Sequence, residues 1–156
     1  MRALPSWLSL LLWLALCLGA GTLGGLFTAG TVQQWYPTLH KPSWNPPAWL
    51  FGPVWTALYL MMAVAAQRVG RRENPRLPLA LFLLQLALNA AWSPIFFGAH
   101  SIGGALIVLA ALWLTLAATT AVFFRRDALA GALLVPYLAW CTFASALNAA
   151  LWRLNP

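Results

Sequence analysis

The feature that most constrains the fold of this chain is how few charges it carries and how far apart they stand. Its 156 residues hold nine Lys or Arg and two acidic residues, Glu73 and Asp127, so that 7% are charged. Soluble domains carry about 25%. The net charge of +7 is spread too thinly to follow a phosphate backbone. The composition therefore excludes a soluble enzyme, a disordered chain and a nucleic-acid-binding domain, and it indicates an integral membrane protein.

The uncharged stretches are long enough to cross a bilayer, which takes about 20 apolar residues per helix. The stretch 77–124 is about twice that length and has a Gly-rich break at 98–104, which predicts two helices and a turn. The first apolar stretch is longer than the roughly 7–15 apolar residues of a signal peptide, so we expect it to be retained in the mature protein as a transmembrane helix. The predicted fold is all-α: one domain, residues 1–156, forming an integral membrane bundle of five transmembrane helices. The predicted spans are 6–28, 46–67, 77–97, 103–124 and 128–152.

The positive charges predict how the bundle is oriented, because five spans put the two chain ends on opposite faces. Only Lys41 and Arg153 fall on the face that carries the C-terminus and the 29–45 loop. The other seven fall on the N-terminal face: Arg2, Arg68, Arg71, Arg72, Arg76, Arg125 and Arg126. The positive-inside rule therefore predicts a cytoplasmic N-terminus, with the C-terminus and the 29–45 loop on the opposite face. We expect a multi-pass protein of a bacterial cell membrane.

Several chemistries are missing. No ionisable side chain lies well inside a predicted span, which argues against an ion-coupled antiporter, a proton channel or a pump. His40 and His100 lie in different loops and the two cysteines on different helices, so neither pair has metal-ligand spacing. We therefore expect no metal site and no required cofactor. A Ser–His–acid triad is also excluded, because Glu73 and Asp127 fall on the face opposite the histidines.

Three predicted helices carry aromatic and polar side chains at helical spacing, which places them on one face of each helix. Amides in the middle of a span should not face lipid, so they point either toward another helix or toward a ligand. The residues alone do not favour one of these two interpretations over the other. A largely apolar cavity with a few polar groups is the usual form of a small-molecule site. The candidate ligand-binding residues are Trp55 and Tyr59 on the second helix; Gln85, Asn89, Trp92 and Phe96 on the third; and Tyr137, Trp140, Ala144 and Asn148 on the fifth.

The loop before the second helix packs four aromatics and four prolines into residues 35–49, and proline stiffens a loop by fixing φ. We expect a semi-rigid lid over the pocket, with Trp44 and Trp49 contributing to the ligand site. The alternative is an interfacial aromatic belt followed by a helix start. Asn45-Pro46-Pro47 predicts an N-cap and first helical turn. Prolines 53, 94 and 136 are expected to interrupt three helices and to open space between them.

The cations near this loop suggest which ligand could enter. His40, Lys41 and Arg153 all fall on the face that carries the loop. A flat apolar ligand with acidic groups could stack on Trp and Tyr while its carboxylates meet these cations.

Several motifs closely resemble the translocator protein family, also called tryptophan-rich sensory proteins or peripheral-type benzodiazepine receptors. The resemblance covers about residues 10–154, with all five spans in register. The motifs are Trp35-Tyr36, Lys41-Pro42-Ser43-Trp44-Asn45-Pro46-Pro47, Gly52-Pro53-Val54-Trp55, Leu58-Tyr59, Gln85-Leu86-Ala87-Leu88-Asn89, Trp92-Ser93-Pro94 and Pro136-Tyr137-Leu138-Ala139-Trp140.

This resemblance implies a five-helix bundle, often a homodimer, that binds porphyrins such as protoporphyrin IX and haem, along with isoquinoline carboxamides, benzodiazepines and, in some members, cholesterol. Asn89 matches a pocket amide of the family, and Ala144 matches a small residue whose enlargement alters ligand affinity. Trp55 and Trp140 match two pocket tryptophans linked to light-dependent breakdown of protoporphyrin.

Two departures from the family pattern matter. The family's cholesterol-recognition stretch has a tyrosine where this chain has Ala149 and Ala150, with only Arg153 kept, so cholesterol binding through that stretch is not expected. Some bacterial members have Trp in place of Ser43.

The leading function is a membrane receptor or sensor of tetrapyrroles that could also carry them across the membrane, and not an enzyme. The alternative is enzyme-like photo-oxidation of protoporphyrin through Trp55 and Trp140.

Overall fold

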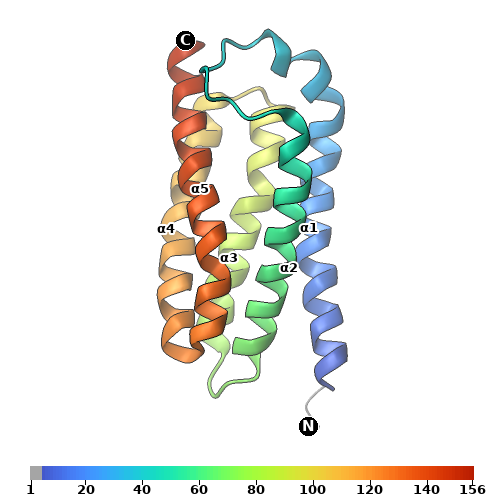
Figure 1. Cartoon of the computed structure of the whole chain (residues 1–156), viewed down its shortest axis with the longest axis vertical. Helices are drawn as coiled ribbons and strands as arrows, with labels where there is room; N and C mark the ends of the chain where they lie inside the picture. The colour runs from blue at the N-terminus through green and yellow to red at the C-terminus, as the bar shows by residue number, and fades with distance from the viewer. Residues whose placement is uncertain (1–4) are drawn as a thin grey trace.

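Five long helices run alternately up and down in the computed structural model, which describes residues 5–156 (Figure 1). All five are long and apolar enough to cross a membrane, which confirms the predicted all-α bundle of five transmembrane helices. Arg2, one of the seven positive charges used to predict orientation, lies outside the described residues. The helices are α1 (Ser6–Gln34), α2 (Phe51–Gly70), α3 (Arg76–Ser93), α4 (Ile102–Arg126) and α5 (Ala128–Leu154).

The helices pack in a ring whose order differs from their order in the chain. The helix α1 contacts α2 and α3, while α2 also contacts α5, and α4 lies between α3 and α5. The order around the bundle is therefore α1–α2–α5–α4–α3. This order makes α2 and α5 neighbours and places α3 across the bundle from them, so the three helices that carry the polar and aromatic stripes surround one interior.

The segment between α1 and α2 differs from its prediction. It contains two short 3-10 helices, η1 (Tyr36–Thr38) and η2 (Ala48–Leu50), and α2 begins only at Phe51. The predicted N-cap at Asn45 is wrong, because Pro47 restricts Pro46 to extended backbone and is itself extended, with ψ 142°. The prediction that Pro53 interrupts α2 is also wrong. Pro53 lies in the first turn, where its missing N–H has no helical partner to lose.

The other two prolines differ: Pro94 ends the α-helical part of α3, whereas α5 runs through Pro136 without a break, so the prediction that Pro136 interrupts its helix is wrong. Pro94 opens a π-helical turn, η3 (Pro94–Gly98), that continues α3, and Pro136 lies inside α5. The following turn places His100 at φ 52°, in the left-handed region, and Ser101 caps α4 by accepting a bond from the Gly104 N–H at 3.3 Å. The break that the sequence predicted at 98–104 is thus a tight turn, and Gly104 already belongs to α4.

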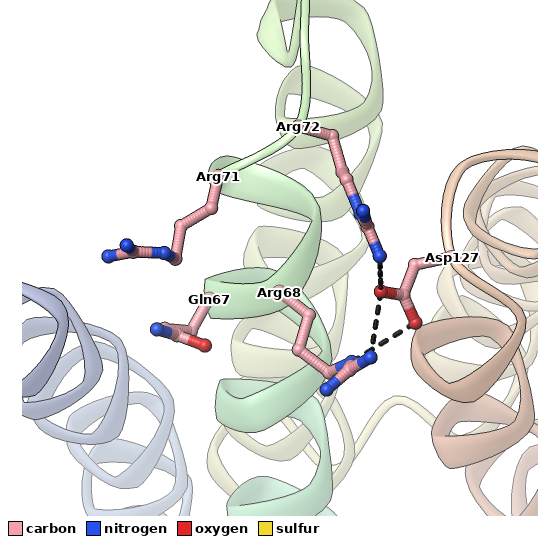
Figure 2. Close-up of a pocket in the computed structure, with 5 residues that line it drawn as sticks. All are labelled: Gln67, Arg68, Arg71, Arg72 and Asp127. Atoms are coloured by element: carbon pink, nitrogen blue, oxygen red, sulfur yellow. Dashed lines mark hydrogen bonds and ion pairs between the residues drawn. The ribbon is translucent and has the colours of Figure 1, made fainter.

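One carboxylate joins three helices at the opposite end of the bundle. Asp127 caps α5 by accepting a hydrogen bond from the Ala130 N–H at 3.0 Å. It also accepts bonds from Arg68 Nε at 3.0 Å and Arg68 Nη2 at 2.9 Å, and from Arg72 Nη2 at 2.5 Å, as Figure 2 shows. Its side chain is only 3% exposed. These bonds hold the end of α2 against the α4–α5 turn.

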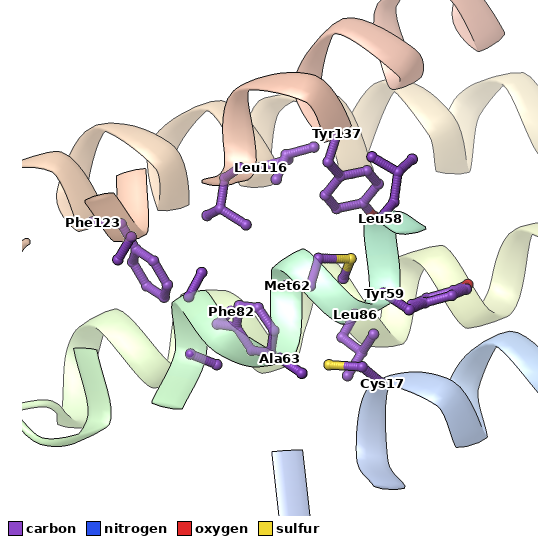
Figure 3. Close-up of a cluster of buried hydrophobic side chains, with 14 of the residues drawn as sticks. Cys17, Leu58, Tyr59, Met62, Ala63, Phe82, Leu86, Leu116, Phe123 and Tyr137 are labelled. Atoms are coloured by element: carbon purple, nitrogen blue, oxygen red, sulfur yellow. The ribbon is translucent and has the colours of Figure 1, made fainter. Parts of the chain in front are cut away.

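The core is filled by close packing between helices (Figure 3). Lipid tails are as apolar as leucine, so dispersion and close fit, not expulsion of water, favour this packing. Small residues on α2, among them Ala63 and Ala66, are fully buried and let the helices approach closely. Phe82 on α3 and Phe123 on α4 stack at 5.9 Å between ring centroids. A second cluster near the η3 end includes Phe96, Phe97, Ile102, Ala105, Leu147 and Leu151.

Candidate functional site

The centre of the site is a chain of hydrogen bonds that joins α2, α3 and α5. The Tyr59 hydroxyl donates to Asn89 Oδ1 at 2.6 Å, and Asn89 Nδ2 donates to the Tyr137 hydroxyl at 2.9 Å. All three side chains are buried, Tyr137 completely. The structure therefore brings together one residue from each predicted stripe, and the Asn89 amide points into the bundle as its mid-span position required.

A second polar link lies closer to the lid end. Trp92 Nε1 donates to Asn148 Oδ1 at 3.1 Å, and Asn148 Nδ2 donates to the Ile102 carbonyl at 2.9 Å. This link ties α3 to α5 and α5 to the start of α4. Trp92 also stacks on Phe96 at 5.0 Å between ring centroids. Asn148 thus pairs with another helix, which is the role that polar side chains commonly have in membrane bundles.

Gln85 is the exception among the amides. Its side chain is fully buried one turn of α3 from Asn89, yet neither Nε2 nor Oε1 has a hydrogen-bond partner within residues 5–156. Burying an unpaired polar group costs about 1–3 kcal/mol. An amide that keeps both its donor and its acceptor free in an apolar interior is suited to bind a polar group of a ligand.

Aromatic rings surround the bonded chain. Trp55 stacks on Tyr59 at 5.5 Å between centroids and meets Tyr137 edge-on at 5.9 Å. Trp140 packs against a different pair, Phe51 at 5.8 Å and Phe143 at 5.5 Å. The two tryptophans thus lie on neighbouring helices but in different aromatic groups. Ala144 lies beside this region on α5, partly buried against the core.

The lid is fastened to the bundle at several points. The Tyr36 hydroxyl donates to Asn45 Oδ1 at 2.8 Å, and burial raises the pKa of that hydroxyl. The Asn155 side chain of the α5 C-terminus bonds both the N–H of His40 at 2.9 Å and its carbonyl at 3.0 Å. Trp35 stacks on His100 at 4.3 Å between centroids. The 29–45 segment therefore closes the end of the bundle, although its first residues, through Gln34, belong to α1.

The proposed carboxylate-binding cations lie at this end, but they are not grouped together. The Lys41 ammonium donates to the Pro37 and Leu39 carbonyls at 3.3 and 3.1 Å and lies 5.0 Å from the Tyr36 ring centroid. His40 is exposed. Arg153 lines a separate hollow of about 390 Å³ on the outside of α5, formed with Ala146, Ala149, Ala150 and Leu154.

The two lid tryptophans differ in position. Trp44 is 48% exposed and packs edge-on against Phe143 at 5.8 Å, which connects it to the Trp140 group. Trp49 is 72% exposed. The structure thus places Trp49 on the outside, where a tryptophan of the interfacial belt belongs, and does not bring it to the other candidate residues.

Sequence reasoning missed three residues that shape the site. Gly21 of α1 lies against Tyr59, and a Cβ built there would come within 2.8 Å of Tyr59 Cδ2. Phe51 and Phe143 enclose Trp140. The spacing of Phe143, three residues from Trp140 on one helix, could have indicated it. None of the sequence patterns described above indicated the contact between Gly21 and Tyr59.

No group of three or more His, Cys, Asp or Glu side chains that could hold a metal ion occurs in the described part of the chain.

At the far end of the bundle, Arg68 and Arg72 hold the pKa of the Asp127 carboxyl well below its usual value of 3.8. This carboxylate stays ionised and fixes the arginines instead of acting in acid–base chemistry.

The chain matches the family model described as "TspO/MBR family" over residues 13–153. Among curated relatives, Protein CrtK of Rhodobacter capsulatus is 44% identical, covering 90% of this chain and 88% of its own length. Tryptophan-rich protein TspO of Chlorobaculum tepidum is 44% identical, covering 96% and 97%. The human Translocator protein is 43% identical, covering 85% and 82%. The match to the family model runs from within α1 to near the end of α5.

Proposed function

The chain belongs to the TspO/MBR family of membrane sensors and translocators, and on that premise we propose that it binds tetrapyrroles such as protoporphyrin IX and haem between α2, α3 and α5. The single observation that carries this proposal is the buried Tyr59–Asn89–Tyr137 chain, flanked by Trp55 and by the unpaired Gln85 amide. Large flat rings to stack on, with a few polar groups at fixed places, are what a planar lipophilic ligand needs.

The ligand binds by exchanging contacts that the protein already makes with itself. In the structure Trp55 packs on Tyr59 and Tyr137, so a porphyrin plane takes the place of one of these ring contacts. The Gln85 amide bonds to a pyrrole nitrogen or to a side-chain carbonyl, which removes the cost of its unpaired burial. Binding thereby changes how α2, α3 and α5 are held together, and this change is the signal of a sensor.

The lid end receives the ligand carboxylates. Lys41 donates to two neutral carbonyls, and a carboxylate competes well for it because it brings a full negative charge to the ammonium. His40 lies beside Lys41 in the chain, and Arg153 lies at the same end of the bundle. Loosening of Lys41 from Pro37 and Leu39 opens the lid, so that entry and carboxylate recognition are one event.

The orientation is part of the same proposal: the N-terminus is cytoplasmic. Six arginines at one end of the bundle against Lys41 and Arg153 at the other support it. Labelling tests it, because both native cysteines are buried. In intact cells a membrane-impermeant maleimide should modify Ser43→Cys in the lid and leave Asn74→Cys in the α2–α3 turn unmodified, and the reverse pattern would invert the topology.

The binding proposal is tested by titrating protoporphyrin IX into the purified protein in detergent and following the porphyrin absorbance. Replacing Trp55 or Trp140 with Leu should weaken binding by about 2- to 13-fold, because a stacked aromatic pair contributes about 0.5–1.5 kcal/mol beyond its area. Trp7→Leu is the matched control, since Trp7 is 64% exposed near the start of α1. Equal effects at all three positions, or none, would defeat the assignment of the site.

The same titration separates binding from the alternative activity. Under light and oxygen, Trp55→Phe and Trp140→Phe variants that still bind protoporphyrin but no longer bleach it would establish photo-oxidation. Variants that lose binding and bleaching together leave the tryptophans with a stacking role alone. The relatives' names describe sensors and translocators, so a binding protein remains the primary proposal.

A further inference from the structure

We propose that the hollow at the C-terminal end of α2 binds the phosphate group of an anionic membrane phospholipid. The hollow has a volume of about 350 Å³ and is lined by Gln67, Arg68, Arg71, Arg72 and Asp127 (Figure 2). It lies at the opposite end of the bundle from the lid and shares no residue with the tetrapyrrole site. The inference therefore stands independently of the proposed ligand.

The charges in this hollow are unbalanced. Three guanidinium groups and one carboxylate line the hollow, and only two of the three guanidinium groups are paired with Asp127. Arg68 bonds Asp127 through Nε and Nη2, and Arg72 through Nη2. A guanidinium has five N–H donors, so each keeps most of its donors free for another acceptor. The excess of positive charge attracts an anion.

Asp127 also prepares the site. Its side chain is 3% exposed, whereas those of Arg68 and Arg72 are 35% and 51% exposed. The buried carboxylate thus holds part of each guanidinium group, while the remaining donors of these partly exposed side chains stay available. Arg71 is exposed and makes no side-chain hydrogen bond within residues 5–156. In Figure 2 it extends from α2 on the same side as Gln67, toward the space beside α1. Planar guanidinium groups fixed in this way suit the oxygens of a phosphate.

The surface next to the hollow identifies the source of that phosphate. Leu60, Val64, Gln67 and Arg71 follow one another at i, i+4, i+7 and i+11, so they form one row along α2. Leu60 is 42% exposed and Val64 is partly exposed, which makes this the outward face of α2 between α1 and α5. The row is apolar within the span and becomes polar at its end. An acyl chain can lie on Leu60 and Val64 while the headgroup phosphate reaches Gln67 and Arg71.

A soluble phosphate compound would use only the arginines, whereas a phospholipid uses the arginines and the apolar row together. Basic pockets between transmembrane helices are known to bind anionic lipid headgroups. The observations therefore favour a lipid.

The test is a titration of the purified full-length chain in neutral detergent with phosphatidylglycerol, with bound lipid counted by native mass spectrometry. Arg71→Gln should weaken phosphatidylglycerol binding by about five-fold, the effect of one basic residue near an anionic bilayer surface. Arg71 is exposed and unbonded, so this variant should keep its thermal stability. Arg125→Gln is the matched control, because it removes one exposed charge from the same end of the bundle but outside the hollow.

The comparison of the two variants is the first arm of the test. A five-fold loss for Arg71→Gln with less than two-fold change for Arg125→Gln supports the site. Equal losses for the two variants would overturn it in favour of general surface charge, and no loss for either would overturn any role of Arg71 in lipid binding. In a second arm, excess inorganic phosphate should leave bound phosphatidylglycerol in place. Displacement of the lipid by inorganic phosphate would overturn the lipid assignment and identify a site for soluble phosphate compounds.

Discussion

The hydrogen-bonded chain between Tyr59, Asn89 and Tyr137 makes a quantitative prediction about stability. Asn89→Leu removes both bonds at once, and it leaves two buried tyrosine hydroxyls without their partner. Hydrogen bonds between membrane helices contribute about 0.6 kcal/mol on average and up to about 1.7 kcal/mol each. We therefore expect Asn89→Leu to lower the free energy of unfolding by about 1.2–3.4 kcal/mol, twice those values for one bond.

The assay is unfolding of the purified protein in mixed micelles with increasing SDS, followed by tryptophan fluorescence. Tyr59→Phe should cost one bond in the wild-type background and almost nothing when Asn89 is already Leu, because its acceptor is then gone. Thr56→Val is the control, since Thr56 is an exposed α2 residue whose hydroxyl bonds only the Gly52 carbonyl of its own helix. It should change stability by less than about 0.5 kcal/mol.

The reasoning is refuted if Tyr59→Phe costs the same with and without Asn89. Such additivity would mean that the two side chains do not interact and that α2 and α3 are held together elsewhere.

Three further predictions follow from the same structure. Gly21→Ala should destabilise the protein and weaken porphyrin binding, because its Cβ displaces the Tyr59 ring. Gly25→Ala, whose Cβ meets nothing within 4 Å, should be neutral or stabilising. Thermal unfolding measures the stability of the two variants, and porphyrin titration measures their binding. Gln85→Leu should raise stability by about 1–3 kcal/mol through loss of an unpaired buried amide, and it should weaken porphyrin binding; a rise in both would contradict its role. The pKa of Asp127 is lowered in the folded protein, so its contribution is fully present above pH 3.8 and is lost as the pH falls below that value; stability followed by acid titration should show this loss, and Asp127→Asn should abolish it.

The sequence was sufficient for the membrane fold because the bilayer imposes it. A helix must hold about 20 apolar residues, and gaps between charges of that length locate α2 to α5 to within a few residues. The helix ends were less predictable. The first helix continues to Gln34 because nothing in residues 29–34 breaks it, and α2 begins at Phe51 because Pro46 and Pro47 keep the preceding backbone extended.

The candidate site was predictable in its faces but not in its pairings. Helical spacing put Gln85 and Asn89 on one side of α3, yet Asn89 is bonded through both its oxygen and its nitrogen, and Gln85 has no partner in the described chain. That difference depends on which residues of α2 and α5 lie opposite each amide, and this is determined by tertiary packing. Trp49 shows the same dependence on tertiary packing. Its place at the end of the proline-rich segment 35–49 does not determine whether its side chain faces inward or outward.

The most direct test of the central claim is the position of bound protoporphyrin IX in an experimental structure of the complex. Density between α2, α3 and α5, in contact with Trp55 and within hydrogen-bond distance of Gln85, is the result that the account predicts. The competing place is the hollow of about 390 Å³ on the outer face of α5, beside Arg153. Porphyrin density in that hollow alone, with the Tyr59–Asn89–Tyr137 bonds unchanged, would contradict the account.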